Sequence, residues 1–220
     1  MQVADLLDVI YTAGTVFDGL STSRPATDAF LRTGDTTGVR GRGDLALLED
    51  LRDAAEIALD CAGSRLDSRL DVAALKRINA AMTRSAALNP GKLRTAAQGI
   101  GVRTPLGRFE PPEIDEAGLD ALITQALNAP NDVERAIELF LRLAKAQPFE
   151  DGNKRTAILA ANAFLIGSGS DVFLTVPFDD NDPATSSRFN EMLARWYLRD
   201  ELTGVKVMLL QNGLAPAPAR

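Results

Sequence analysis

The residues best suited to chemistry in this sequence lie together in one short segment, residues 147–157. It reads Gln-Pro-Phe-Glu-Asp-Gly-Asn-Lys-Arg-Thr-Ala, so the carboxylate of Asp151, a Gly-Asn pair and the cations Lys154 and Arg155 are close neighbours. A strongly helical run follows, and the first backbone N–H groups of a helix attract anions. Backbone N–H groups and positive charge therefore converge on one point, which is the chemistry of a nucleotide polyphosphate site.

Residues of these types are also common at the start of any helix, where they cap the backbone or are simply solvated. Their joint order favours a phosphate-binding loop over that plainer interpretation. The loop contains no histidine, and the whole chain has none. With a single cysteine, Cys61, the sequence excludes an internal disulfide and the usual zinc and redox-metal sites.

The composition is that of an ordinary soluble globular protein, 45% apolar and 25% charged over 220 residues. We expect one domain over residues 1–205, with a helical extension over 1–60 and a C-terminal tail over 206–220 that is disordered at its end. The net charge of −6 argues against a nucleic-acid partner. No apolar run approaches the roughly 20 residues that cross a bilayer, and no signal-peptide pattern is present. We therefore expect a cytoplasmic protein with no membrane partner.

Apolar periodicity predicts a mainly α-helical protein, whose helices must position the loop. Helices are expected over residues 2–12, 44–62, from 71 to before 89, 113–128, 132–146, 153–167 and 184–201. The helix after the loop is apolar on almost every side between Thr156 and Ile166, which is typical of a buried central helix. Residues 100–112 predict a short β-hairpin around the turn Thr104–Gly107.

Residues 147–155 resemble the motif of the Fic family, whose fold is also known as Fic/Doc or Fido. The motif is His-x-Phe-x-(Asp/Glu)-Gly-Asn-(Gly/Lys)-Arg, placed between two central helices. The segment Leu88–Arg94 resembles the family's Pro-Gly-x-x-Arg segment, and Ile100–Pro112 resembles its target-binding hairpin, the flap. The resemblance covers residues 10–205, approximately, and implies a helical bundle with a buried central helix and a short hairpin flap.

Most Fic proteins transfer a nucleoside monophosphate, usually AMP from ATP, to a hydroxyl of a target protein, and the Doc branch transfers phosphate. The resemblance implies that Asp151 holds Mg²⁺ between the α- and β-phosphates of a nucleoside triphosphate, most simply ATP. It implies that Gly152 lets the backbone approach, that Asn153 and its neighbours supply N–H groups, and that Arg155 binds the distal phosphates. A target protein would contact the flap at Ile100, Gly101, Val102 and Arg103.

The chain departs from the motif where the family has its catalytic histidine, a position held here by Gln147. The histidine takes the proton from the target hydroxyl, whereas a glutamine can only position a hydroxyl or a water. Losing a general base lowers the rate by a factor on the order of 10² to 10⁴. A second arginine, frequent three residues after the first, is Ile158 here, as is common in the Asn-Lys-Arg subgroup. Lys154 either replaces part of that phosphate contact or points into solvent.

Many Fic proteins with an N-terminal extension carry an inhibitory element, (Ser/Thr)-x-x-x-Glu-(Gly/Asn), whose glutamate pairs with the second arginine. The nearest match here is Gly14–Gly19, which lacks both the hydroxyl and the glutamate. The segment is either a degenerate brake, consistent with little activity to restrain, or an ordinary helix end.

Three functions are compatible with this sequence. The first is a nucleotide-binding pseudoenzyme or regulator, unable to carry out ordinary protein AMPylation, because the phosphate-binding residues are retained without the base. The second is an active nucleotidyl- or phosphotransferase of altered chemistry, in which Gln147 positions a substrate that needs no deprotonation. The third is a protein-interaction scaffold with a vestigial loop.

Overall fold

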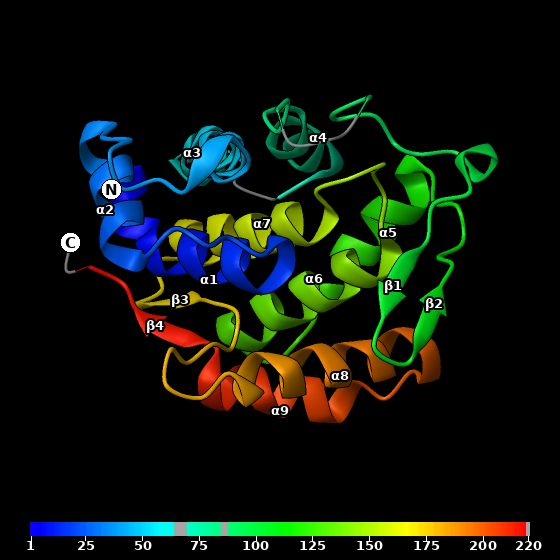
Figure 1. The fold of residues 1–220 in the computed structure, drawn as a ribbon. Coiled ribbons are helices and arrows are strands. Elements are labelled where there is room, and N and C mark those ends of the chain that lie inside the picture. Colours follow the sequence, from blue (N-terminus) through cyan, green and yellow to red (C-terminus); the bar gives the residue numbers. More distant parts are fainter. Residues whose placement is uncertain (64–69, 85–87, 219–220) are drawn as a thin grey trace.

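The computed structural model describes residues 1–63, 70–84 and 88–218, and it confirms the predicted mainly α-helical fold (Figure 1). The described α-helices are α1 (Leu7–Asp18), α2 (Arg24–Thr33), α3 (Gly41–Gly63), α4 (Val72–Ala80), α5 (Glu116–Ala126), α6 (Asp132–Ala146), α7 (Asn153–Ser168), α8 (Ala184–Arg199) and α9 (Leu202–Asn212). Two antiparallel pairs of strands accompany them, β1 (Val102–Thr104) with β2 (Gly107–Phe109) and β3 (Val172–Leu174) with β4 (Leu214–Pro216). None of the described helices is both long and apolar enough to span a membrane.

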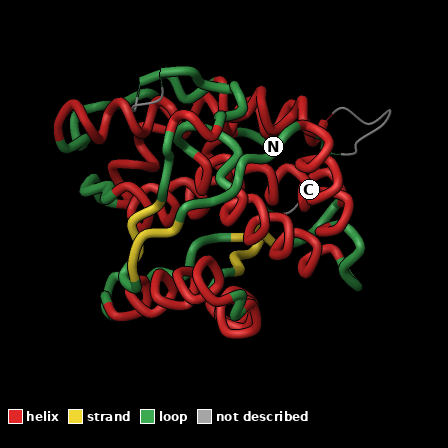
Figure 2. Tube along the Cα trace, turned by 90° about the vertical axis from the view of Figure 1, so that its right-hand side faces the viewer, coloured by secondary structure: helices red, strands yellow, loops and turns green. Residues whose placement is uncertain are grey.

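Helix α7 lies at the centre of the bundle, in contact with α1, α3, α4 and α6 (Figures 1 and 2). The predicted burial on almost every side is confirmed, since each residue from Ala157 to Ala163 is at most 3% exposed. The one polar side chain in this stretch, Asn162, is fully paired. Its Nδ2 donates to the Ile158 and Leu174 carbonyls (2.9 and 2.8 Å), and its Oδ1 accepts the Leu174 N–H (2.9 Å). Asn162 thereby attaches β3 to the central helix.

Helix α6 leads into the loop and ends where the sequence predicts. Asn131 caps its start, because Oδ1 accepts the Glu134 N–H (3.0 Å). Its apolar stripe is fully buried at Ile137, Phe140, Leu141 and Ala144. The helix stops at Ala146, because Gln147 takes a left-handed conformation (φ 47°) and Pro148 follows without an N–H to donate.

The N-terminal part is more helical than the sequence predicts. The expected helix over 2–12 begins as a 3₁₀ helix over Val3–Leu6 and continues as α1 to Asp18, where it ends because Gly19 adopts a left-handed φ of 71°. Helix α2 was not among the predicted elements. Its start signals are nevertheless present, since Ser23 caps the helix through its hydroxyl and Pro25 occupies the first turn.

The C-terminal residues differ from the expected tail over 206–220. Helix α9 crosses that boundary and runs to Asn212, and β4 follows it, paired with β3. Beyond the strand, the Ala217 N–H donates to the Asp171 carbonyl (2.8 Å). The tail is therefore a paired strand over Leu214–Pro216, because pairing with β3 satisfies the backbone of this segment.

The predicted flap hairpin is confirmed. Its strands pair Val102 with Phe109, Arg103 with Arg108 and Thr104 with Gly107. The Thr104 hydroxyl closes the turn by donating to the Gly107 carbonyl (2.6 Å). The Phe109 ring lies 5.2 Å from that of Tyr197, between centroids, so the flap rests on α8 at the end of the bundle where the loop lies.

Candidate functional site

The loop between α6 and α7 is shaped by two left-handed residues, Gln147 at its start and Gly152 (φ 71°) at its end. Position 152 requires glycine for two reasons. Its backbone is left-handed, and a Cβ there would lie 2.8 Å from the Met82 sulfur. The Thr156 N–H donates to the Gly152 carbonyl (2.8 Å), closing the first turn of α7. The N–H groups that come before Thr156 at the start of α7 have no acceptor within the helix. This end of α7 is therefore suited to binding an anion.

Two buried asparagines hold the loop in place. The Asn153 side chain bonds both backbone groups of Phe149, donating to its carbonyl (2.9 Å) and accepting its N–H (2.8 Å). On α4, Asn79 donates to the Asp151 carbonyl (2.9 Å) and accepts the Gly91 N–H (2.8 Å). The motif pointed to Asn153, whereas nothing in the local sequence around Asn79 marks it as a loop contact.

The segment 88–94 braces the loop from outside. One carboxylate oxygen of Glu150 accepts the N–H groups of Leu88 (3.1 Å) and Asn89 (3.0 Å). The Arg94 N–H donates to the Pro148 carbonyl (2.9 Å). The segment that resembles the family's Pro-Gly-x-x-Arg sequence thus has a structural role that its sequence did not reveal.

The side chain of Arg94 joins the loop to the end of the flap. It is only 4% exposed. Its Nε donates to the Gln147 carbonyl (2.6 Å), and its Nη2 donates to the carbonyls of Pro112 (2.7 Å) and Pro111 (3.0 Å). Burial lowers the pKa of Arg94. Its guanidinium therefore fixes the backbone at Gln147 and is not directed at a phosphate.

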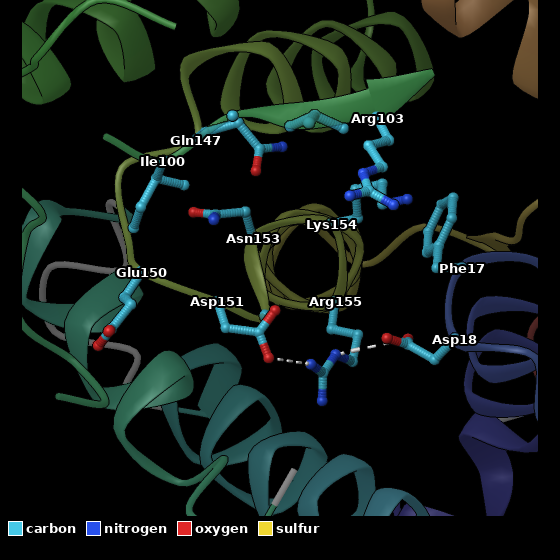
Figure 3. A pocket seen from close by; sticks show the side chains of 13 residues that line it. Phe17, Asp18, Ile100, Arg103, Gln147, Glu150, Asp151, Asn153, Lys154 and Arg155 are labelled. Atoms are coloured by element: carbon cyan, nitrogen blue, oxygen red, sulfur yellow. Dashed lines mark hydrogen bonds and ion pairs between the residues drawn. The ribbon is translucent and has the colours of Figure 1, made fainter. Parts of the chain in front are cut away.

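A cavity of about 270 Å³, named here the phosphate cavity, opens in front of the N-terminus of α7 (Figure 3). Its lining includes every site residue predicted from the sequence: Ile100, Gly101, Val102, Arg103, Gln147, Asp151, Gly152, Asn153, Lys154 and Arg155. Phe17, Asp18 and Glu150 complete the lining. The fold thus brings the loop, the flap and the end of α1 to one place.

A second cavity of about 200 Å³, named here the side cavity, adjoins the first and shares Val102, Arg103 and Lys154 with it. The rest of its lining comes from the flap, α1 and α8: Val16, Thr104, Pro105, Asn190, Leu193, Ala194 and Tyr197. Lys154 and Arg103 therefore stand where the two cavities meet.

Arg155 is buried (3% exposed) and pairs with two carboxylates. Its Nη2 lies 3.1 Å from Asp151 Oδ2, and its Nε lies 3.5 Å from Asp18 Oδ2 (Figure 3). Burial raises the pKa of Asp18, and the cations of Arg155 and Lys154 offset part of that rise. Arg155 is thus oriented before any ligand binds.

The carboxylate of Asp18 connects the segment Gly14–Gly19 to the motif loop. The segment ends a helix, and its one carboxylate is directed at the motif arginine. The arginine contacted is the first of the motif, because the second position holds Ile158, which is fully buried and apolar. A shorter side chain than glutamate therefore pairs with a different arginine from the one in the family pattern.

Lys154 does not extend into solvent. Its Nζ lies 4.6 Å from the centroid of the Phe17 ring, and the side chain lines both cavities. Burial lowers the pKa of Lys154, while the nearby Asp18 carboxylate acts in the opposite direction. Of the two placements that the sequence allowed, the structure has the one inside the site.

Gln147 stands at the position of the family's base and points into the phosphate cavity (Figure 3). Its Nε2 donates to the Ala144 carbonyl (2.5 Å). The neighbouring Tyr197 hydroxyl is buried and has no hydrogen-bond partner among the described residues. Burial raises the pKa of Tyr197. The neutral amide of Gln147, beside the neutral phenol of Tyr197, therefore stands where the family has the imidazole of its histidine.

Comparison with known proteins agrees with this geometry. The model of the Fic/DOC family matches residues 69–165, a segment with α4 at one end and α7 at the other. A Fic domain containing signaling protein from Bacteroides thetaiotaomicron has the same fold, with a TM-score of 0.66 and 18% identity over 93% of this chain and 78% of that one. Fic-1 from C. elegans has a TM-score of 0.66 and 18% identity, over 94% of this chain and 59% of that one. A Fic family protein from Desulfovibrio desulfuricans has a TM-score of 0.60 and 14% identity, over 94% of this chain and 64% of that one.

This chain therefore spans less than two thirds of the C. elegans and D. desulfuricans structures. No curated protein matches the sequence. The matched segment nonetheless contains the motif loop, the bracing segment and the flap, so residues 69–165 are similar to the Fic/DOC family and the chain has the fold of the Fic structures.

Proposed function

We propose that this protein binds a nucleoside triphosphate with Mg²⁺ in front of α7 and acts as a nucleotide-responsive regulator, not as an ordinary AMPylating enzyme. One contrast within a single loop carries the proposal. Asp151, Gly152, Asn153 and Arg155 line the cavity as a phosphate cradle would, while Gln147 holds the position of the base.

The phosphate cavity has the chemistry of a polyphosphate site. The N-terminal N–H groups and the dipole of α7 favour negative charge in front of the helix. Lys154 and Arg155 bring positive charge to the same place from successive positions of α7. The planar guanidinium of Arg155, already held by carboxylates, can exchange one of them for phosphate oxygens.

The side cavity offers a place for the nucleoside. Val16, Leu193 and Ala194 give it apolar walls, against which a flat base can pack. Asn190 adds a side-chain amide, which can pair with the edge of a base. A small apolar space with one polar group is the usual composition of a site for such a ligand.

Mg²⁺ fits this site through one protein carboxylate. Asp151 lines the phosphate cavity, and its side chain is 42% exposed, so a bound ion can reach its oxygens. No three Asp, Glu, Cys or His side chains come together as a metal cluster in the part of the chain that the structure describes. This agrees with an ion shared between one carboxylate and the phosphates, where Mg²⁺ would offset the phosphate charge.

No neighbouring carboxylate takes over the work of the missing base. Glu150 is engaged by backbone N–H groups, and Asp18 and Asp151 both face Arg155. The chain has no histidine to substitute from elsewhere. Transfer to a target hydroxyl would therefore be slower by a factor on the order of 10² to 10⁴.

One observation favours the alternative of an active transferase with altered chemistry. The Gln147 side chain faces the cavity, and beside it lies the Tyr197 hydroxyl, for which the residues in the structure supply no hydrogen-bond partner. Together they could position an acceptor that needs no deprotonation. A target protein at the flap and a location in the cytoplasm, where Mg²⁺ and ATP are available, belong to either form of the proposal.

Calorimetric titration with Mg-ATP tests the proposal. The natural protein should bind one equivalent, and Arg155→Ala should abolish saturable binding. Arg135→Ala is the matched control, because Arg135 pairs with Asp132 at the far end of α6 (2.8 Å). No binding of ATP, GTP, CTP or UTP would overturn the proposal and favour a scaffold. A mass increase on the natural protein or a partner after incubation with Mg-ATP would favour the transferase instead.

A further inference from the structure

We propose that Arg103 of the flap binds the polyphosphate chain of the nucleotide, supplying from the hairpin the cation that Ile158 does not provide. This inference rests on the proposed function and names the residue that would link the nucleotide to the flap. The sequence pattern assigned Arg103 to contact with a target protein. The structure gives it a second role.

The placement of Arg103 is the first observation. Its side chain reaches from β1 toward Lys154, over the N-terminal end of α7 (Figure 3). It lines both the phosphate cavity and the side cavity. A ligand with its base in one cavity and its phosphates in the other must pass Arg103.

The second observation is that Arg103 has no negative partner within the described part of the chain. Among the described residues, its guanidinium makes no hydrogen bond or ion pair. Arg108, its cross-strand neighbour, is paired differently, since its Nε lies 2.9 Å from Glu110 Oε1 and its Nη2 donates to the Gly99 carbonyl (3.1 Å).

The register of the flap makes this lack of a partner costly. Arg103 and Arg108 stand directly opposite one another, so their side chains leave the same face of the two-stranded sheet. Like charges opposite one another destabilise a strand pair. Glu110 relieves that repulsion at Arg108, and an anion in the cavity would relieve it at Arg103.

The balance of charges in the phosphate cavity also favours Arg103 as a phosphate ligand. Its carboxylates are Asp18, Asp151 and Glu150. The first two face Arg155, and Glu150 accepts backbone N–H groups from the bracing segment. Arg103 therefore adds positive charge to the cavity that no described carboxylate offsets. A polyphosphate bound there would draw the flap toward α7.

Calorimetry with ATP, ADP and AMP, each with Mg²⁺, tests this inference on Arg103→Ala. Losing a guanidinium–phosphate contact should weaken ATP binding on the order of tenfold or more and should weaken AMP binding much less. Arg108→Ala is the matched control, because it removes the same charge from the same flap beside Glu110. It should leave ATP affinity within about threefold of the natural protein.

Limited trypsin digestion gives an independent measurement on the natural protein. Mg-ATP should slow cleavage after Arg103 more than cleavage after Arg108. If Arg103→Ala and Arg108→Ala bind ATP equally, or both sites are protected equally, the inference is wrong while the nucleotide site stands. If the natural protein binds no nucleotide at all, the proposed function fails first and this inference fails with it.

Discussion

The carboxylate of Asp18, at the end of α1, lies 3.5 Å from the guanidinium Nε of Arg155, at the start of α7. This pair places a negative charge from the N-terminal helix on the cation that should receive phosphate. Under the proposed function, a phosphate that enters the cavity would compete with Asp18 for Arg155 and would be repelled by it. The N-terminal helix would then oppose the ligand that the loop is proposed to bind.

Asp18→Asn should tighten binding of Mg-ATP, on the order of tenfold, because it removes that repulsion and leaves Arg155 to the phosphate. Asp8→Asn is a suitable control, since Asp8 lies on the same helix and pairs with Arg24, a residue of α2, outside the cavity. Calorimetry on both variants checks the expectation. Equal or weaker affinity in Asp18→Asn would show that Asp18 orients Arg155 for phosphate instead of competing with it.

The same variant should change how stability depends on pH. Burial raises the pKa of Asp18 above its usual value of 3.8. A carboxyl with a higher pKa in the folded state contributes stability below the pKa of the unfolded chain, and that contribution is lost as the pH rises through the folded pKa. The Tm of Asp18→Asn should therefore rise relative to the natural protein between about pH 3.5 and pH 7. A Tm difference that stays constant in scanning calorimetry over this range would contradict the raised pKa.

Gln147→His should restore a general base and permit AMP transfer to the protein itself. The gain over the natural protein should be on the order of 10² to 10⁴, with a pH profile that follows imidazole ionisation. Histidine tolerates the left-handed conformation of this position better than most residues, so the fold should be retained. Intact-mass measurements after incubation with Mg-ATP give the readout. A variant that binds nucleotide and stays unmodified would mean that more than the base has been lost.

Gly152→Ala should destabilise the fold more than Gly19→Ala. Both glycines have a φ of 71°, but a Cβ at Gly19 meets open space and one at Gly152 lies 2.8 Å from the buried Met82 sulfur. The left-handed conformation costs about 1 to 2 kcal/mol at either position, and overpacking adds about 1 to 3 kcal/mol at Gly152. Urea unfolding of the two variants measures the difference. Equal free energies of unfolding would show that Met82 moves away without cost.

The sequence predicts the elements that carry a local signal. The apolar stripe of α6, the Asn131 cap and the uniformly apolar α7 each follow from residues a few positions apart, and the structure has them. The flap follows from its turn in the same way. Strands β3 and β4 escape prediction, because each has only three residues and no alternation can be recognised over so short a span.

The candidate site likewise contains residues that carry a local sequence signal and residues that do not. The motif loop is contiguous, so its residues can be found from their order alone. Asp18, Asn79 and Arg94 reach the loop only through the packing of α1, α4 and the bracing segment, and each interacts there with groups distant in the sequence. The sequence marks Asp18 and Arg94 only as members of segments compared with family patterns, and it does not show what they contact. The ion pair between Asp18 and Arg155 could therefore be identified only in three dimensions.

The position of the N-terminal residues also has a practical consequence for the experiments above. They lie on the side of the molecule where β4 pairs with β3, while the flap lies at the opposite end (Figures 1 and 2). A purification tag, a fluorophore or a sensor chip attached at the N-terminus would thus face away from the cavities. Tethered measurements of nucleotide and partner binding can then be made on one immobilised sample, with the flap exposed to solution.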